Sequence, residues 1–338
     1  MSWVVGNAKN LSLGLLVLQN TSLVLLMRHS LTTEGPRYMS STAVALMEML
    51  KLAVCCGVVY MESGEWRTFV RKLRVDVARK PRELAKLTIP ALLYTVQNNM
   101  LYTALANLDA ATYSVCYQTK ILTTALFSMI LLRKRLDLMK WAALILLTVG
   151  VALAELSDLS TKRGVASSGA KEHAQSPFLG FMCVMAAACT SGFAGVYFEM
   201  LLKGSRTSLW IRNIQMGIPS ILISLVSVLL KDWSNVTTNG FFYGYNRVVV
   251  GVVLLQAIGG LVVAVVVKYA DNIRKSFATA VSIIISCIMS TFLFDFHPNG
   301  IFVLGVMCVC ASVFIYSRPP AEKGLPSFHK VRSVTRRI

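Results

Sequence analysis

The sequence is poor in charge. Of its 338 residues only 15% are Asp, Glu, Lys or Arg and 55% are hydrophobic, whereas a soluble domain carries about a quarter charged residues. A soluble chain could not bury so much apolar surface, so that class is excluded. With a mean hydropathy of +0.61, the apolar residues must face lipid or one another, and the charges collect in the connections between apolar segments.

Acidic residues and histidines are also scarce. There are 16 Asp and Glu against 34 Lys and Arg, and only four His. The basic residues form short clusters between apolar stretches, without a basic face or a stacking motif, which argues against a nucleic-acid partner. No His is central in an apolar segment, and we find no clustered metal ligands or nucleophile elbow. We therefore expect no catalytic residues, no metal and no cofactor, and a carrier fits better than an enzyme.

The eight cysteines lie inside apolar segments. Their spacing shows no pairing that would coordinate a metal, and we interpret them as small buried hydrophobic residues. They are Cys55, Cys56, Cys116, Cys183, Cys189, Cys287, Cys308 and Cys310.

Long apolar windows predict an all-α membrane protein. A helix needs about 20 mainly apolar residues to cross the hydrocarbon, and ten windows of this kind are bounded by charged or turn residues. They are 8–28, 40–61, 85–106, 110–131, 139–156, 178–201, 208–230, 247–267, 276–294 and 299–317.

Basic residues are distributed unequally between the two sides of these spans. The side that holds both termini carries 23 Lys and Arg against seven on the other side. The positive-inside rule therefore predicts that both termini are cytosolic. The sequon Asn235-Val236-Thr237 then lies in a lumenal connection, where glycosylation is compatible with this orientation.

The order of the spans suggests a duplication. A polar lumenal connection, 157–177, separates a first five-span half, 1–156, from a second five-span half, 178–317, and a basic cytosolic tail, 318–338, follows. Because five is odd, the two halves enter the membrane in opposite senses. This is the inverted arrangement that many secondary transporters use for alternating access.

Span four places two tyrosines and a lysine on one face. At 100° per residue, Tyr113, Tyr117 and Lys120 fall within a narrow sector of the helix. Two aromatic rings beside an ammonium group suit a planar base and a phosphate. A lysine can instead snorkel to the membrane edge, but Lys120 lies about mid-span, which favours a binding role.

Span three carries three adjacent amides, Gln97, Asn98 and Asn99, with Tyr94 and Tyr102 four residues on either side of Asn98. Three adjacent amides cannot all avoid lipid, so some of them face the bundle. There they either join helices or exchange hydrogen bonds with a ligand, and both readings stay open.

Span six contains small residues around Ser191, and Gly192 and Gly195 are three residues apart. Such residues let two helices pack closely. Alternatively, the missing side chains leave room for the base of a substrate. The sequence does not decide between these two interpretations.

Span seven begins with Arg212 and Asn213. We expect Arg212 to be structural, either paired with Glu199 or at the cytosolic edge, and Asn213 to contact a ligand. In span two, Glu48 and Lys51 are three apart, so they are expected to neutralise one another.

A further charged segment, 268–275, joins spans eight and nine. Its Lys275 could face the cavity from the half opposite to Lys120. A charge run of this kind is usually a solvated turn, so the residues alone favour the solvated interpretation.

Several sequence blocks resemble the signature blocks of nucleotide-sugar transporters, and the resemblance covers spans two to ten. The blocks are 94–99 (YTVQNN), 107–113 (NLDAATY), 117–121 (YQTKI), 191–199 (SGFAGVYFE), 208–215 (SLWIRNIQ) and 268–273 (KYADNI). They are similar to the subgroup that carries UDP-galactose, UDP-N-acetylglucosamine and CMP-sialic acid into the Golgi. The block 120–128 and the pair Met216-Gly217 look like the UDP-sugar branch. Thr119 and the triplet Arg274-Lys275-Ser276 depart from the usual pattern.

This resemblance implies a ten-span fold and exchange of a nucleotide sugar for the corresponding nucleoside monophosphate. It also assigns roles to residues that match the motifs. Lys120 and Lys275 would contact phosphate, and the residues around the nucleoside would be Tyr117, Asn98, Tyr113, Asn213, Ser191, Gly192 and Gly195. Gln97, beside Asn98, completes the expected substrate site.

We therefore expect an antiporter in the Golgi membrane, or in that of the endoplasmic reticulum, that moves UDP-N-acetylglucosamine, UDP-galactose or both in exchange for UMP. The alternative is a CMP-sialic acid carrier, and a membrane-embedded glycosyltransferase is the alternative from another class. The expected partners are the nucleotide sugar, UMP and the lipid bilayer, with a second copy of the chain or a Golgi glycosyltransferase as protein partner.

Overall fold

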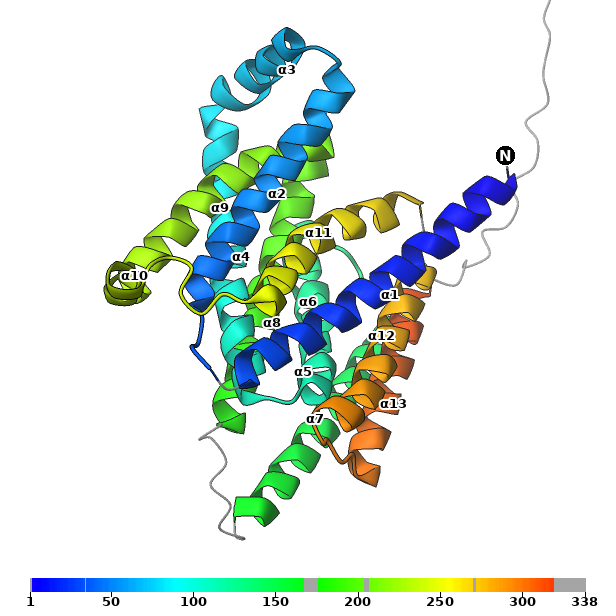
Figure 1. Cartoon of the computed structure of the whole chain (residues 1–338). Coiled ribbons are helices and arrows are strands. Elements are labelled where there is room, and N and C mark those ends of the chain that lie inside the picture. Colours follow the sequence, from blue (N-terminus) through cyan, green and yellow to red (C-terminus); the bar gives the residue numbers. More distant parts are fainter. Residues whose placement is uncertain (1, 34, 167–175, 204–206, 270–271, 319–338) are drawn as a thin grey trace, which may run out of the picture.

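The computed structural model describes residues 2–33, 35–166, 176–203, 207–269 and 272–318, and these residues are helical without any strand (Figure 1). The long helices are α1 (Ser2–Thr32), α2 (Ser40–Ser63), α4 (Pro81–Asn107), α7 (Leu138–Ala166), α8 (Pro177–Lys203), α9 (Leu209–Lys231), α11 (Arg247–Tyr269), α12 (Asn272–Leu293) and α13 (Gly300–Ser317). One further apolar segment consists of α5 (Ala110–Cys116), the 3-10 turn η2 (Tyr117–Thr119) and α6 (Lys120–Leu132).

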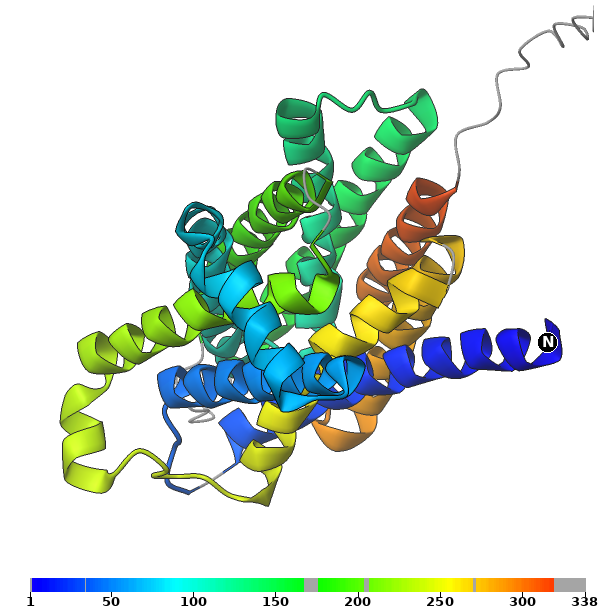
Figure 2. The ribbon, with the colours of Figure 1, turned by 90° about the horizontal axis from the view of Figure 1, so that it is seen from above.

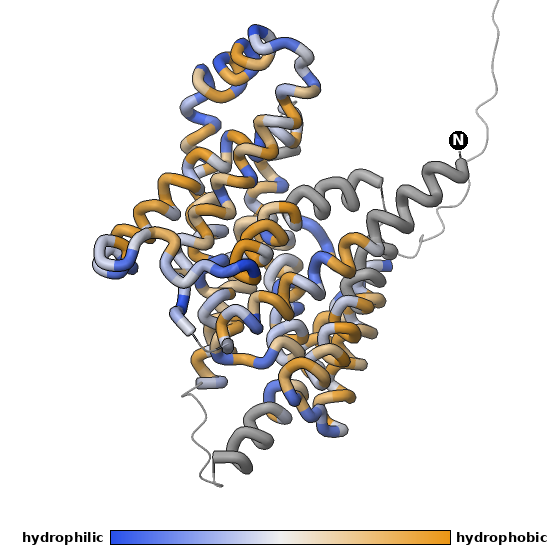
Figure 3. Tube along the Cα trace, in the orientation of Figure 1, coloured by the Kyte–Doolittle hydropathy of each residue, from blue (hydrophilic) through white to orange (hydrophobic). Residues whose placement is uncertain are grey.

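All ten windows predicted from hydropathy are helical in the described residues. Six helical segments there are long and apolar enough to cross a membrane, and α11 and α12 each contain a shorter apolar stretch. The chain is thus a multi-pass α-helical membrane protein. Figure 3 shows apolar residues along much of the coloured parts of these helices.

The structure differs from the sequence-based prediction at several places. Span four is not a continuous helix, because the 3-10 turn η2 interrupts it directly before Lys120. Helix α7 runs ten residues beyond 156, through Gly164 to Ala166, so part of the predicted polar connection is helical. Cys189 is exposed, which corrects the expectation that every cysteine is buried.

Two connections between spans contain short helices that hydropathy did not indicate. On the basic side, α3 (Trp66–Leu73) and the π-helical turn η1 (Arg74–Ala78) join α2 to α4. On the opposite side, α10 (Trp233–Asn239) follows α9. Below, these two ends of the bundle are called the α3 end and the α10 end.

Local sequence explains where several helices begin and end. The Ser208 hydroxyl accepts a hydrogen bond from the Ile211 amide (3.3 Å), and the Asn299 side chain accepts one from the Phe302 amide (2.9 Å). Both residues are preferred N-caps. Pro81 occupies the first turn of α4, and Gly64 ends α2 with φ +69°, a conformation that glycine adopts without strain.

The main helix contacts join the first five predicted spans to the last five. Helix α1 packs on α11 and α12, α2 on α9 and α11, α4 on α8 and α9, and α7 on α13. Figure 2 shows these helices crossing one another when the bundle is seen from above. At the α7–α13 crossing, a Cβ on Gly150 would lie 2.8 Å from the Gly305 carbonyl oxygen. The small residues therefore set the closest helix approach there.

Polar side chains also link the two sets of spans at the α10 end. The Tyr102 hydroxyl of α4 donates to Gln256 Oε1 of α11 at 2.9 Å. Two further links are the Thr42–Tyr245 hydroxyl pair (3.1 Å) and the Ser41 hydroxyl donating to the Asp232 carboxylate. The bundle is therefore held together at this end by hydrogen bonds as well as by apolar packing.

Candidate substrate-binding site

The predicted column of Tyr113, Tyr117 and Lys120 is confirmed. The two tyrosine rings are stacked, with centroids 5.6 Å apart and planes 15° from parallel. Lys120 Nζ lies 4.4 Å from the Tyr117 ring centroid, at a distance at which an ammonium is attracted to an aromatic face. The turn η2 brings the three side chains together even though the helix is not continuous.

Two other predicted residues contact this column. Gln97 Nε2 of α4 donates to the Tyr117 hydroxyl oxygen at 2.9 Å, and Ser191 of α8 lies near the same hydroxyl. Three parts of the sequence thus approach one phenol. Gln97 is 7% exposed, and its Oε1 has no hydrogen-bond partner in the described structure.

The three adjacent amides of α4 separate in the structure. Gln97 reaches another helix, whereas Asn99 Nδ2 donates to the Thr95 carbonyl of its own helix at 3.0 Å. Asn98 is partly buried, and no hydrogen bond to its side chain occurs among the described residues. Gln97 therefore joins helices in this conformation.

The two glycines of α8 have different surroundings. A Cβ on Gly192 would lie 2.4 Å from Thr123 Oγ1 and 2.8 Å from the Thr124 amide of α6. A Cβ on Gly195 would meet only the Tyr94 hydroxyl, at 3.8 Å. Close packing thus explains Gly192, and the space beside Gly195 fits the alternative interpretation, room for part of a substrate.

Arg212 does not pair with Glu199, which corrects one of the two placements expected for it. Its Nη1 lies 2.8 Å from Glu83 Oε2, and the Glu199 carboxylate pairs with Lys134 at 2.8 Å. Arg212 is 1% exposed and also donates to Gln215 Oε1 at 3.0 Å. The residue is structural, as expected, but its acidic partner comes from the start of α4.

Asn213 lies beside the pair Glu48 and Lys51, whose predicted mutual neutralisation is confirmed at 3.0 Å. The three residues border a small void together with Gly217. Asn213 Nδ2 donates to the Leu209 carbonyl of its own helix at 3.0 Å. The tenth predicted site residue, Lys275, belongs to α12, and its side chain lies outside the described residues.

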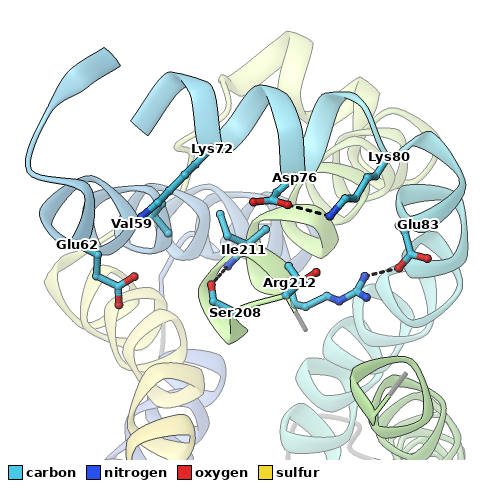
Figure 4. A pocket seen from close by; sticks show the side chains of 10 residues that line it. Val59, Glu62, Lys72, Asp76, Lys80, Glu83, Ser208, Ile211 and Arg212 are labelled. Atoms are coloured by element: carbon cyan, nitrogen blue, oxygen red, sulfur yellow. Dashed lines mark hydrogen bonds and ion pairs between the residues drawn. The ribbon is translucent and has the colours of Figure 1, made fainter. Parts of the chain in front are cut away.

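A cavity of about 510 Å³ lies at the α3 end, away from the tyrosine column. Figure 4 shows its walls, with Asp76 pointing toward Lys80 and Arg212 toward Glu83. The lining residues are Val59, Glu62, Lys72, Asp76, Lys80, Glu83, Thr207, Ser208, Ile211 and Arg212. Three basic and three acidic side chains balance, so charge alone does not select an ion for this cavity.

Hydropathy did not indicate this cavity, because α3 and η1 in the connection between α2 and α4 form one wall, and the ends of α2, α4 and α9 form the others. The sequence signal that could have indicated this cavity was Arg212, because an arginine within an apolar segment requires an acidic partner. The Arg212 guanidinium, through its hydrogen bond, holds the pKa of the Glu83 carboxyl below the ordinary value of 4.5, although partial burial opposes this effect. The ion pair is therefore charged at neutral pH.

Comparison with known proteins places these residues in a family. The sequence profile described as nucleotide-sugar transporter matches residues 5–317. A UDP-N-acetylglucosamine transporter of Rattus norvegicus is 50% identical over 95% of this chain and 98% of its own length. A UDP-N-acetylglucosamine/UDP-N-acetylgalactosamine transporter of Caenorhabditis elegans is 46% identical over 93% and 94%. A UDP-galactose translocator of Bos taurus is 44% identical over 92% and 78%. The chain belongs to the nucleotide-sugar transporter family and is a carrier, not an enzyme.

Proposed function

We propose that the chain is an antiporter that moves UDP-N-acetylglucosamine, UDP-galactose or both from the cytosol into the Golgi lumen in exchange for UMP. The observation that carries this proposal is the stacked pair Tyr113 and Tyr117 with Lys120 beside it. Its aromatic rings suit the uracil base and its ammonium suits a phosphate. The identity to transporters of UDP-sugars favours UDP over CMP substrates.

The exchange follows from contacts that both substrates share. If most of the binding free energy comes from the nucleotide, UDP-sugar and UMP compete for one site, because each presents a base and a phosphate. If reorientation of the empty carrier has a high free-energy cost, the carrier changes its open side only when a substrate is bound. Entry of a UDP-sugar is then coupled to exit of UMP. A nucleotide that enters beside Tyr117 must replace the hydrogen bond from Gln97, which leaves that amide available to the base.

Helix packing supports two inverted five-span halves. If span one corresponds to span six, two to seven and so on, the contact of α1 with α11 corresponds to that of α8 with α4. Likewise, α2 with α11 corresponds to α9 with α4, and α1 with α12 to α8 with α6. When the two halves are exchanged, the members of three contacting pairs swap places, so each of these pairs is unchanged. They are α2–α9, α5–α12 and α7–α13. This two-fold pattern agrees with alternating access by rocking of the halves.

The same correspondence relates α5 and α6, which carry Tyr113, Tyr117 and Lys120, to α12, which carries Lys275. We therefore retain Lys275 as the second phosphate ligand, from the opposite half. The proposal also places both termini in the cytosol and the chain in the Golgi membrane. As protein partner it includes a second copy of the chain or a Golgi glycosyltransferase.

The test uses the purified chain in liposomes preloaded with UMP or with CMP, and measures uptake of labelled UDP-N-acetylglucosamine, UDP-galactose and CMP-sialic acid. We expect uptake of a UDP-sugar that requires internal UMP. Lys120→Ala should reduce it to near background. Lys140→Ala, which removes one charge at the partly buried start of α7, is the matched control and should retain uptake. Uptake driven only by CMP, or wild-type exchange by Lys120→Ala, would overturn the proposal.

A further inference from the structure

Helix α3 carries a basic and aromatic surface that the transport site does not use. It follows α2 after a two-residue turn and lies at the far end of the α2–α4 hairpin (Figure 1). Phe69 is 7% exposed and anchors one face of α3 to α2 and α9, in a cluster with Val59 and Ile211. Leu73 packs against the same cluster and Lys72 lines the cavity, whereas the opposite face of α3 is exposed.

An exposed tryptophan at the start of α3 indicates where this helix lies relative to the membrane. Trp66 is 64% exposed, and its ring lies 6.2 Å from that of Tyr60, in the last turn of α2. Tyr60 and Met61 are themselves 44% and 76% exposed at the end of a membrane-spanning helix. Tryptophan and tyrosine prefer the membrane–water interface. The contact between their rings at the end of α2 is therefore typical of a helix that lies in that interface.

Three arginines continue the exposed face beside the tryptophan. At 100° per residue, Trp66, Val70, Arg74, Arg67 and Arg71 occupy one sector of about 140°, which changes from apolar to basic. All five are exposed. Among the described residues, none of the three guanidinium groups forms an ion pair. Figure 3 shows this mixture of apolar and polar residues along α3.

The acidic residues near this face do not neutralise it. The carboxylate of Asp76 is paired with Lys80 at 2.8 Å, on the cavity side of η1. Glu62 lines the cavity and Glu65 directly precedes α3, and in the described structure neither forms an ion pair with the three arginines. The basic face is therefore complementary to negative charge, and the exposed Trp66 and Val70 form its apolar edge.

We propose that the surface formed by Trp66, Val70, Arg67, Arg71 and Arg74 binds the headgroups of anionic phospholipids in the adjacent leaflet. Trp66 and Val70 enter the boundary between headgroups and acyl chains, and the three arginines contact lipid phosphates and carboxylates. The identification of this leaflet as the cytosolic one rests on the orientation in the proposed function. The lipid binding itself does not depend on which substrate is carried.

The expected preference for anionic over neutral lipid can be estimated from the three arginine charges. Each basic residue near an anionic membrane surface increases affinity by about fivefold at ordinary ionic strength, so three of them give a preference on the order of 100-fold. Salt screens such contacts over about 10 Å at 0.1 M and 3 Å at 1 M. The preference should therefore weaken strongly in high salt.

The experiment counts lipids bound to the full-length chain by native mass spectrometry, with phosphatidylserine and phosphatidylcholine as the two probes. We expect preferential binding of phosphatidylserine that is lost in the variant R67Q/R71Q/R74Q and reduced in Trp66→Ala. The matched control is R79Q/R82Q/K86Q. It removes the same charge from exposed residues of the adjoining segment that lack an exposed tryptophan, and it should retain the preference.

Two results with the variants would overturn the proposal. One is an unchanged phosphatidylserine preference in R67Q/R71Q/R74Q, and the other is an equal loss in both triple variants, which would indicate diffuse attraction to all basic residues. Titration of the wild type with NaCl gives a second measurement that needs no variant, and a preference insensitive to salt would also contradict the proposal. UDP-sugar exchange measured in parallel tests the proposed function separately.

Discussion

The glycine pair of α8 allows a test that separates helix packing from substrate binding. Replacement of Gly192 by Ala would place a methyl carbon 2.4 Å from Thr123 Oγ1 and 2.9 Å from the Thr123 carbonyl carbon. Because part of this obstacle is backbone, a rotamer change cannot relieve it, and α8 must move away from α6. The Thr123 hydroxyl, which donates to the Ala188 carbonyl at 2.7 Å, would be displaced as well.

The expected cost for Gly192→Ala is about 1–3 kcal/mol of stability from overpacking, and loss of the interhelical hydrogen bond adds about 0.6 kcal/mol. Gly195→Ala should differ, because the nearest atom to its new methyl would be the Tyr94 hydroxyl at 3.8 Å, an ordinary contact distance. We expect its stability to stay within about 0.5 kcal/mol of the wild type. If nucleotide occupies that space, KM for the UDP-sugar should increase about tenfold or more.

The assay compares unfolding temperature in detergent with UDP-sugar uptake by UMP-loaded liposomes for the two variants and the wild type. The expected pattern is a lower unfolding temperature for Gly192→Ala, and a raised KM at wild-type stability for Gly195→Ala. Wild-type uptake kinetics in Gly195→Ala would refute the assignment of substrate to that space. Wild-type stability in Gly192→Ala would refute the packing argument.

Three further variants test individual contacts. Tyr117→Phe leaves Gln97 without its acceptor, so stability should fall by about 1–3 kcal/mol, and a retained unfolding temperature would contradict this. Glu83→Gln leaves the buried Arg212 charge unpaired. We expect a loss of about 2 kcal/mol, between the values for exposed and buried pairs. Because the pKa of the Glu83 carboxyl is lowered, its stabilisation is present above pH 4.5 and is lost as the pH falls through the depressed pKa. The difference in unfolding temperature between wild type and Glu83→Gln should therefore be constant from pH 6 to 8 and should decrease below pH 4.5. Tyr102→Phe removes a link across the α10 end, and single-turnover release of substrate to that side should become faster, whereas an unchanged rate would argue against a closing role.

Hydropathy was sufficient to predict the long helices, because the thickness of the hydrocarbon core sets the apolar length that a spanning helix needs. It could not predict α3 and η1, since an eight-residue amphipathic helix is stabilised by contacts such as those of Phe69, which no local pattern reveals. It also could not predict the turn η2. The residues from Tyr117 to Thr119 contain no proline or glycine, so the tighter winding depends on neighbouring helices and not on local propensity.

The candidate site was predictable where periodicity alone decides which side chains meet. The spacing of Tyr113, Tyr117 and Lys120 placed them on one face, and the structure confirms their contact. Partners between helices were not predictable in this way, because helix pairing is a tertiary property. Arg212 illustrates this limit, since its charge indicated a need for a carboxylate but not that Glu83 would supply it.

The ion pairs and hydrogen bonds that join the proposed halves at each end of the bundle determine how easily that end can open. Among the described residues, the links between the proposed halves at the α3 end include Arg212–Glu83, Lys134–Glu199 and Gln215 to the Asp76 carbonyl. At the α10 end they include Tyr102–Gln256, Thr42–Tyr245, Ser41–Asp232, Lys231–Ser40 and Ser157–Asn299. Neutral hydrogen bonds contribute about 0.5–1.5 kcal/mol each and those to charged groups about 1.5–3 kcal/mol. The two sets therefore differ by no more than a few kcal/mol. A bundle with such balanced ends can open either one for a cost that substrate binding can supply, as alternating access requires.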